Sequence, residues 1–292
     1  MSDAETYAAN LDCWSGPVTL TRLDGGISND NFLVNDGGKK YVVRVNGDVP
    51  EHGVLRINDF NCNRAAAAVG IAPAVHHYED HALVVDFVHG RTLEEADVRD
   101  DAMLERILDL IKRSHRDAFH HVRGPISAFW PFRVCRDYAF FLEDNNSRMI
   151  PELSTIRQLN KDLEAAIGPI DLVLGHNDLL AANFLDGGDR LWLIDWEHAG
   201  FTSPLFDLAN LASNNELSEA QQEWLLEAYF ENPVTDDLRH QYHAMSAASL
   251  LREAMWSMVS EIQSTIDFDY VAYSDEFSGR FNRAVDRLKD YQ

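Results

Sequence analysis

Short runs of apolar residues alternate with polar turns over the first part of the chain. Three of these runs are rich in Val, Leu, Phe and Thr, and they cover residues 18–24, 31–34 and 41–45. Asn35 to Gly38, between the second and third runs, are residues that tolerate the positive φ of tight turns. The pattern therefore predicts an antiparallel sheet with a hairpin at this point.

A helix and two more strands are predicted next. Residues 55–69 contain helix formers, including a run of four alanines, and Gly70 followed by a proline is a typical helix stop. Two apolar runs within 73–88 flank the polar turn at 79–81 and are typical of strands. The order strand, strand, strand, helix, strand, strand makes residues 1–88 one β-rich unit.

Helical periodicity replaces this alternation after residue 88. The first helix predicted there has one apolar stripe, formed by Met103, Leu104, Ile107, Leu108 and Ile111. Three short β-type runs within 171–194 interrupt the helical pattern, and the turn Asp-Gly-Gly-Asp joins the last two. No repeat or low-complexity linker separates the halves, so we expect 1–88 and 89–292 to pack around one cleft.

Composition and charge narrow the classes of function. The chain has 292 residues, 46% of them hydrophobic, which is typical of an ordinary globular protein. Its formal charge of -23 repels nucleic-acid backbones and anionic lipids but would concentrate small cations near a pocket. Without a run of about 18 apolar residues or a leader with an apolar core, we expect no membrane insertion and a cytoplasmic location.

The cysteines give no sign of a metal site or a disulfide framework. Cys13, Cys62 and Cys135 are an odd number, lie far apart and show no C-x-x-C spacing. We expect each to be a small buried hydrophobic residue.

The strongest chemical signal is a set of polar residues in an apolar setting. Asp178 and Asn183 stand in a D-x-x-x-x-N pattern, and Asp195 follows at the end of the next apolar run. Phosphoryl transfer uses this order, with one Asp at the nucleophile's proton and an Asn and a second Asp holding Mg²⁺ on nucleotide phosphates. Mg²⁺ prefers oxygen ligands and takes only one or two from protein. Taken singly, a residue of this kind is more often a turn former or a helix cap than a catalyst.

These segments resemble a known family. The sequences GHNDLLAANFL at 175–185 and LIDWEHAG at 193–200 are similar to the catalytic segment of the choline/ethanolamine kinase family, an aminoglycoside-phosphotransferase-like branch of the protein-kinase-like fold. Residues 251–273 resemble its C-terminal substrate helices. The resemblance implies an α/β chain of the α+β type with two lobes, a small β-rich nucleotide lobe over 1–88 and a larger, mainly helical lobe over 89–292.

The resemblance implies roles for the catalytic segment. Asp178 would be the base that activates the substrate hydroxyl, and Asn183 and Asp195 would bind Mg²⁺. His176 would orient the catalytic loop without reacting. Asp207 would either cap the helix that it opens or brace the catalytic loop.

The nucleotide side follows from the same resemblance, with ATP as the phosphoryl donor. Arg44 takes the place that protein kinases give to Lys and would pair with the phosphates through its bidentate fork. Asp59 matches the acidic partner of that cation. An exposed strand cation and a surface helix Asp are the plain alternatives.

Two further nucleotide segments carry weaker signals. Ser28 and Asn29 lie in a stretch similar to the family's phosphate-loop hairpin and would cover the phosphates. The neighbouring glycines by themselves predict only a turn. The backbone of Asp86, Phe87 and Val88 would form the hinge that binds adenine.

The implied acceptor is a small cationic alcohol. Ammonium groups are bound by aromatic faces and carboxylates, and Glu197 and Trp256 match the family's residues of these two kinds. Phe201 would add another face. Where the family often has a second Trp, this chain has Glu253, which favours a cation that donates hydrogen bonds, such as a primary ammonium. Trp256 also suits a core position on an amphipathic helix.

Three functions remain open at this stage. The first is transfer of the γ-phosphoryl group of ATP to choline, ethanolamine or a related amino alcohol. The second is a kinase of the same fold for an aminoglycoside, homoserine or a sugar derivative. The third is a silent pseudokinase, against which the presence of Asp178, Asn183 and Asp195 together argues. Whether the chain forms a homodimer is also open.

Overall fold

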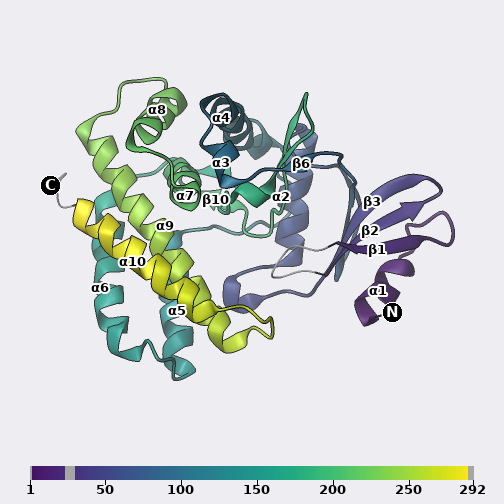
Figure 1. Ribbon diagram of the computed structural model, residues 1–292, viewed down its shortest axis with the longest axis horizontal. Helices are drawn as coiled ribbons and strands as arrows, with labels where there is room; N and C mark the ends of the chain where they lie inside the picture. The colour runs from purple at the N-terminus through teal and green to yellow at the C-terminus, as the bar shows by residue number, and fades with distance from the viewer. Residues whose placement is uncertain (1, 24–29, 289–292) are drawn as a thin grey trace.

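The alternating runs of the first lobe form a five-stranded antiparallel sheet in the computed structural model, which describes residues 2–23 and 30–288 (Figure 1). The strand order is β1-β2-β3-β5-β4, with bounds β1 Thr19–Leu23, β2 Asp30–Asp36, β3 Lys39–Val45, β4 Val75–Glu79 and β5 Ala82–Asp86. Tyr41, Val43 and Val45 are buried on one face of the central strand β3. Because side chains alternate along a strand, Arg44 points to the opposite face.

Helices cover both faces of this sheet. Helix α1 (Asp3–Ala9), which the sequence did not lead us to expect, packs its buried Ala8 against Phe32 and Val34 of β2. On the Arg44 side lies α2 (Arg56–Ala68), preceded by the 3-10 turn η1 (Pro50–His52). Since α2 carries Asp59, the central strand and this helix bring two of the predicted site residues together.

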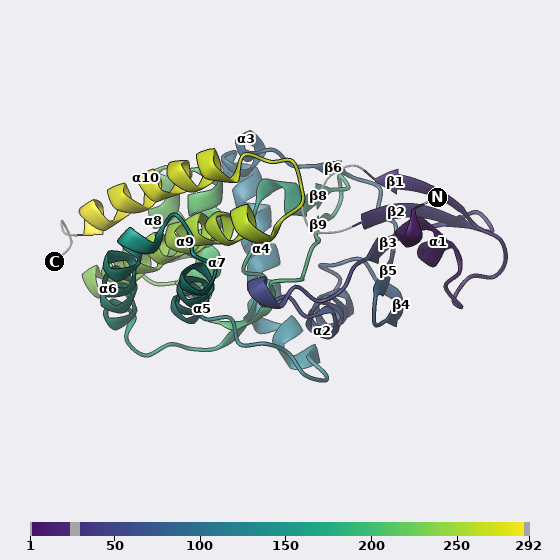
Figure 2. The same ribbon diagram turned by 90° about the horizontal axis from the view of Figure 1, so that it is seen from below.

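The second lobe is mainly helical, as predicted. Its helices are α3 Glu95–Val98, α4 Asp101–Arg116, α5 Pro131–Asp144, α6 Ile150–Ile167, α7 Pro204–Asn215, α8 Glu219–Phe230, α9 Asp236–Gln263 and α10 Tyr270–Leu288, with the 3-10 turn η2 at Ala118–His121. The long helix α9 runs beside α10 and packs on α5, α6 and α7 (Figures 1 and 2). Its buried side chains form the centre of the large core.

Short strands form the part of the helical lobe that faces the sheet lobe. A three-stranded sheet has the order β6-β8-β9, with β6 at Arg91–Thr92, β8 at Phe184–Asp186 and β9 at Leu191–Leu193. The predicted hairpin joins β8 and β9. A second pair consists of β7 (Val173–Gly175) and β10 (Gly200–Thr202), and β10 was not predicted. The domain division predicted after residue 88 falls between β5 and β6.

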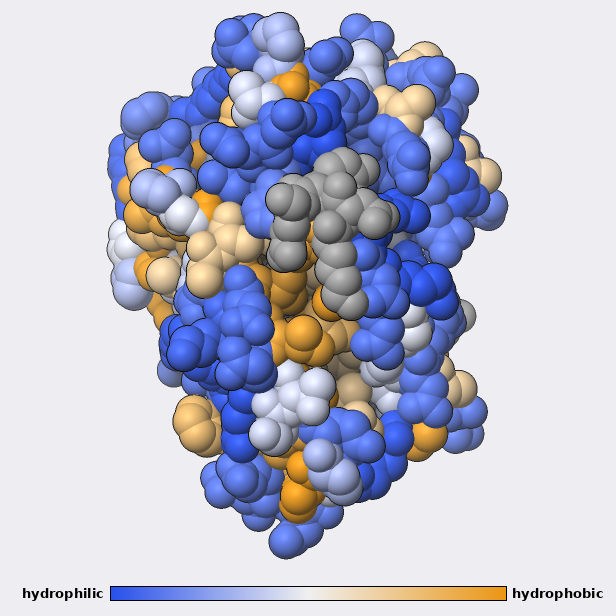
Figure 3. Space-filling view, turned by 90° about the vertical axis from the view of Figure 1, so that its left-hand side faces the viewer, coloured by the Kyte–Doolittle hydropathy of each residue, from blue (hydrophilic) through white to orange (hydrophobic). Residues whose placement is uncertain are grey.

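The outer surface of the helical lobe is mostly hydrophilic. Seen from the end of that lobe, apolar side chains gather in a central furrow between polar ones (Figure 3). Within residues 2–23 and 30–288, no helix is long and apolar enough to cross a membrane. Cys62 and Cys135 are buried, as expected, and Cys13 is partly buried.

Candidate active site

The predicted catalytic loop starts where β7 ends. Gly175 is required there, because a Cβ atom at this position would clash with the Thr202 side chain of the paired strand β10. Asn177 then adopts a left-handed backbone conformation with φ 66°, which a non-glycine residue adopts only at an energetic cost. The Asn177 Nδ2 group donates to the His198 carbonyl at 3.0 Å. This hydrogen bond therefore helps to hold the turn before Asp178 in its strained conformation.

Asp207 of α7 holds the backbone of this loop. Its Oδ2 accepts a hydrogen bond from the His176 N–H at 2.8 Å, and its Oδ1 accepts one from the Asn177 N–H at 2.7 Å. His115 Nε2 lies 2.9 Å from Oδ2. Burial raises the pKa of Asp207, but the hydrogen bonds from His115 and the loop outweigh it and leave the pKa lowered. Ser203 caps α7, so the alternative of Asp207 as the cap is wrong.

The side chain of His176 is buried and connects the catalytic loop to a neighbouring strand. Its side chain is fully buried, and Nε2–H donates to the Ile194 carbonyl at 2.9 Å, which ties the loop to the end of β9. Burial lowers the pKa of His176, so the ring is neutral. This geometry supports an orienting role for His176.

Asp178, Asn183 and Asp195 meet at one end of the β8–β9 hairpin. Asn183 Nδ2 donates to the Asp178 carbonyl at 2.8 Å and to its Oδ2 at 3.2 Å. The Ile194 N–H donates to the Asn183 carbonyl at 2.9 Å, so Asn183, just before β8, and Asp195, just after β9, lie at the same end of the hairpin. Asp195 has a φ of 67°, a second strained backbone position. Burial raises the pKa of Asp178 to about 7.

The donor set at this end of the hairpin fits Mg²⁺. Asn183 and Asp195 offer an amide oxygen and a carboxylate, and a hard ion of this kind takes few ligands from protein and the rest from phosphates and water. Among the described residues, no group of three or more His, Cys, Asp and Glu side chains could hold a metal alone.

A buried network of ion pairs joins the two lobes above this hairpin. Arg44 NH2 lies 2.6 Å from Asp195 Oδ1 and 3.2 Å from Glu197 Oε2, and Arg44 NH1 lies 3.5 Å from Asp59 Oδ2. Arg56 NH1 lies 2.9 Å from the same Glu197 oxygen and 3.7 Å from Asp59 Oδ2. Burial raises the pKa of Asp59 to about 6. The network places Arg44 beside a predicted metal ligand, on the strand predicted to face the phosphates.

Sequence reasoning missed Arg56. Arg56 precedes Asp59 by one turn of α2, and its side chain pairs with Glu197, 141 residues further along the chain. Its position on the same helix face as Asp59 was the one available signal.

The other wall of the site is formed by α9, α10 and their neighbours. Arg252, with 2% of its side chain exposed, has NH1 at 2.7 Å from Glu253 Oε2 and at 3.9 Å from Asp178 Oδ1. The Tyr273 hydroxyl donates to Glu253 Oε1 at 2.9 Å. The ring centroids of Tyr273 and Trp256 are 6.2 Å apart. Glu253 and Trp256, which the sequence singled out, thus belong to one cluster that reaches Asp178, whereas Arg252 and Tyr273 were missed.

The remaining residues predicted from the sequence are Phe201, the hinge residues and two residues of the phosphate loop. Phe201 packs against Phe119 of η2, with 5.4 Å between ring centroids, so its role at the acceptor stays a prediction. The Asp86 and Phe87 N–H groups donate to the carbonyls of Ala74 and Lys40, so Asp86 ends β5 and Phe87 and Val88 follow directly after it. Ser28 and Asn29 lie outside the described residues.

These features define the class of protein. The model of the phosphotransferase enzyme family matches residues 19–243, which is most of the chain and includes the catalytic hairpin, the ion-pair network and α7. The chain belongs to this family and is a phosphotransferase.

Particular relatives agree with the resemblance predicted from the sequence. Protein LicA of Haemophilus influenzae is 30% identical over 218 residues, which cover 70% of this chain but only 61% of LicA. Ethanolamine kinase 1 of Mus musculus is 27% identical over 297 residues, which cover 88% of this chain and 81% of the enzyme. The chain therefore spans about three fifths of the length of that LicA protein and about four fifths of the length of ethanolamine kinase 1.

Solved structures confirm the predicted fold. A choline/ethanolamine kinase family protein of Mesorhizobium loti matches with a TM-score of 0.79 at 24% identity, over 99% of this chain and 96% of that chain. LicA in complex with AMP matches with a TM-score of 0.77 at 22% identity, over 99% of this chain and 97% of that chain. The predicted protein-kinase-like fold is thus confirmed.

Proposed function

We propose that this phosphotransferase transfers the γ-phosphoryl group of ATP to the hydroxyl of a small cationic amino alcohol, with a preference for a primary ammonium such as that of ethanolamine. The observation that carries the proposal is the cluster in which Asp178, Arg252 and Glu253 stand next to one another. It puts a candidate base and a candidate ammonium partner within reach of one small molecule.

Asp178 has the properties of a base at neutral pH. Burial raises its pKa to about 7, and a base is most effective when its pKa lies near the working pH. Asp178 would accept the proton of the acceptor hydroxyl while the hydroxyl oxygen bonds to the γ-phosphorus and the bond to ADP breaks. The positive charge of Arg252 lowers the pKa of Asp178 and so opposes the effect of burial. Arg252 thereby keeps the base partly ionised.

The nucleotide side rests on Arg44 and the hairpin end. Arg44 lies in the buried network next to Asp195 and would exchange part of this pairing for the phosphates of ATP. Asn183 and Asp195 would hold Mg²⁺, which neutralises phosphate charge when it is bound. The AMP-bound LicA of the same fold supports a nucleotide donor.

The charge of the site favours a cationic acceptor. The carboxylates of the two walls are Asp59, Asp178, Asp195, Glu197 and Glu253, and the arginines are Arg44, Arg56 and Arg252. Five carboxylates against three arginines leave an excess of two negative charges when all are ionised. A site of this charge attracts both Mg²⁺ and an ammonium group.

Glu253 supports a primary ammonium over a quaternary one. Its carboxylate already accepts from the Arg252 guanidinium at Oε2 and from the Tyr273 hydroxyl at Oε1, and each oxygen can accept a further hydrogen bond from an N–H donor but none from a trimethylammonium group. The Trp256 face nearby suits either cation. Glu197, the acidic residue first expected at the ammonium, is paired with two arginines, Arg44 and Arg56, whereas Glu253 is paired with one, Arg252, so we assign the ammonium to Glu253.

The test is a panel of acceptors with ATP consumption and phosphorylated product as readouts. The panel contains ethanolamine, choline, an aminoglycoside, homoserine and a sugar derivative. We expect ethanolamine to have the highest kcat/KM, and Glu253→Gln to lower kcat/KM for ethanolamine roughly tenfold while it changes that for choline much less, because a charge-assisted hydrogen bond is lost only for the N–H donor. Asp237→Asn, at an exposed position of the same helix α9, is the control.

Other results would point elsewhere. Turnover of homoserine, the sugar or the aminoglycoside without turnover of either amino alcohol would favour a kinase of this fold for another alcohol. Binding of Mg-ATP in a thermal-shift assay without any phosphorylated product would favour a pseudokinase.

A further inference from the structure

A loop of the sheet lobe reaches into the wall that faces the proposed acceptor. Residues 46–55 connect β3 to α2, and η1 forms the tip of this loop with His52 at its end. His52 Nδ1 lies 3.1 Å from the Tyr138 hydroxyl of α5, and Nε2 lies 3.2 Å from Ser260 Oγ of α9. Both ring nitrogens of His52 therefore contact the other lobe.

His52 also stands beside Trp256. The two ring centroids are 5.7 Å apart with an angle of 33° between the planes. The Tyr138 ring meets His52 edge-on, also at 5.7 Å. Trp256 also has Tyr270 and Tyr273 as ring neighbours, at 6.1 Å and 6.2 Å. Trp256 is thus in contact with two aromatic residues of the helical lobe and one histidine of the sheet lobe.

The ring of His52 is neutral under ordinary conditions. Burial and the nearby charge of Arg252 lower its pKa to about 4. A neutral imidazole adds an aromatic surface to the wall without repelling a cation. A charged ring at the same place would oppose an ammonium group.

The base of the loop is fixed to the ion-pair network. Arg56 donates from its backbone N–H to Asp48 Oδ1 at 2.7 Å and from Nε to the Gly47 carbonyl at 2.8 Å, while its NH1 pairs with Glu197. Val49 and Val54 close the loop with two backbone hydrogen bonds of 2.9 Å and 3.1 Å. The position of His52 is therefore tied to Arg56, the arginine that pairs with Glu197.

We propose that His52 is a positioning residue for the acceptor, whose ring holds Trp256 in place and completes the acceptor wall from the nucleotide-binding lobe. The inference rests on the proposed function, since it concerns the acceptor of that reaction. It makes the acceptor site a product of both lobes.

The test separates the ring of His52 from its hydrogen bonds. His52→Phe keeps an aromatic ring beside Trp256 but leaves the two hydroxyls without their partner, whereas His52→Gln keeps hydrogen-bonding groups and loses the ring. Glu51→Gln, exposed on the same loop, is the matched control. For each variant, the KM of the acceptor, the KM of ATP, kcat and Tm are measured with the acceptor that the wild-type enzyme phosphorylates best. Because that acceptor is chosen by measurement, the test of His52 does not depend on whether the acceptor is ethanolamine.

We expect His52→Gln to raise the KM of the acceptor about 3- to 30-fold, the range of a lost aromatic contact with a cation or a ring, while the KM of ATP changes less than about twofold. His52→Phe should have a KM for the acceptor near that of the wild type but a lower Tm. A purely structural role would make KM and Tm change together. Equal acceptor KM values for wild type and His52→Gln, or an acceptor KM for His52→Phe as high as that for His52→Gln, would overturn the proposal.

Discussion

The two walls of the candidate site are built in different ways. The catalytic wall is one stretch of chain, 175–197, and its turn is fixed by two successive backbone N–H groups that donate hydrogen bonds to Asp207. The acceptor wall is assembled from η1, α5, α9 and α10, and its contacts are between side chains far apart in the sequence.

Because of this difference, we expect the catalytic wall to determine the reaction and the acceptor wall to determine which acceptor is bound. The catalytic wall is held through backbone atoms, so its geometry does not depend on which side chains face the acceptor. The acceptor wall is held through side chains such as Glu253 and Tyr273, so single substitutions can change its chemistry without moving Asp178. We therefore expect changes in the first wall to abolish turnover or stability, and changes in the second to alter KM and pH dependence.

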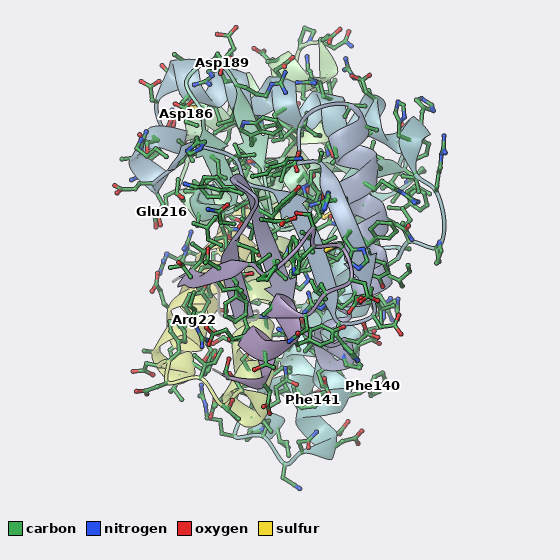
Figure 4. All side chains as sticks on the ribbon, turned by 90° about the vertical axis from the view of Figure 1, so that its right-hand side faces the viewer. Arg22, Phe140, Phe141, Asp186, Asp189 and Glu216 are labelled. Carbon is green, nitrogen blue, oxygen red and sulfur yellow. The ribbon has the colours of Figure 1, made fainter. Side chains whose placement is uncertain are left out.

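The largest effect should come from Asp178 itself. Asp178→Asn keeps the size of the side chain and removes the base, so we expect kcat to fall roughly 10²- to 10⁴-fold with little change in the KM of ATP. The control is Asp189→Asn in the turn of the same hairpin, where the side chain lies at the rim of the molecule (Figure 4). Single-turnover assays with ATP should show the loss. A kcat for Asp178→Asn within tenfold of the wild type would remove Asp178 from the role of base.

The sequence predicted the catalytic wall well because its constraints are local. Asp178, Asn183 and Asp195 have spacings set by one loop and one two-stranded hairpin, and such spacings are visible along the chain. The lobes, the helix at 56–68 and the β8–β9 hairpin followed from periodicity and turn residues for the same reason.

The acceptor wall was harder to predict because its partners depend on tertiary packing. Arg252 appeared as one more residue of an amphipathic helix, and only the packing of α9 against the loop brings it to Asp178. His52 had no local signal, since its partners lie 86 and 208 residues away. Glu197 was expected at the acceptor, but Arg56, which no local pattern pairs with it, engages its carboxylate.

The second prediction concerns the support of the catalytic wall. Asp207→Ala removes the acceptor of two loop N–H groups and the partner of His115, so we expect a loss of about 3 kcal/mol in the free energy of unfolding. Urea denaturation of the variant and the wild type measures this. Glu219→Ala at the exposed start of α8 is the control, with little expected change.

The same substitution has a pH signature. The pKa of Asp207 is lowered in the folded state, so its stabilising contribution is complete above the ordinary pKa near 3.8 and is lost as the pH falls below it. The difference in unfolding free energy between wild type and Asp207→Ala should thus be constant from about pH 5 to 8 and shrink toward pH 3. A difference that grows on acidification would contradict the assignment of Asp207 as an ionised brace.

The smallest effect tests the point where the two walls meet. Asp178 must be ionised to act as a base, and its pKa of about 7 predicts that kcat/KM rises with pH up to about 7 and levels off above it.

Arg252 opposes the effect of burial on the pKa of Asp178 through its positive charge, 3.9 Å from Asp178 Oδ1. In Arg252→Met the rise should therefore move to higher pH by about one unit or more, because the ionised form of Asp178 loses a favourable charge. Arg252→Lys, which keeps the charge, should move it less. A pH profile for Arg252→Met that coincides with that of the wild type, in a folded protein, would mean that the acceptor wall does not act on the base at all, and that the two walls are independent even where they touch.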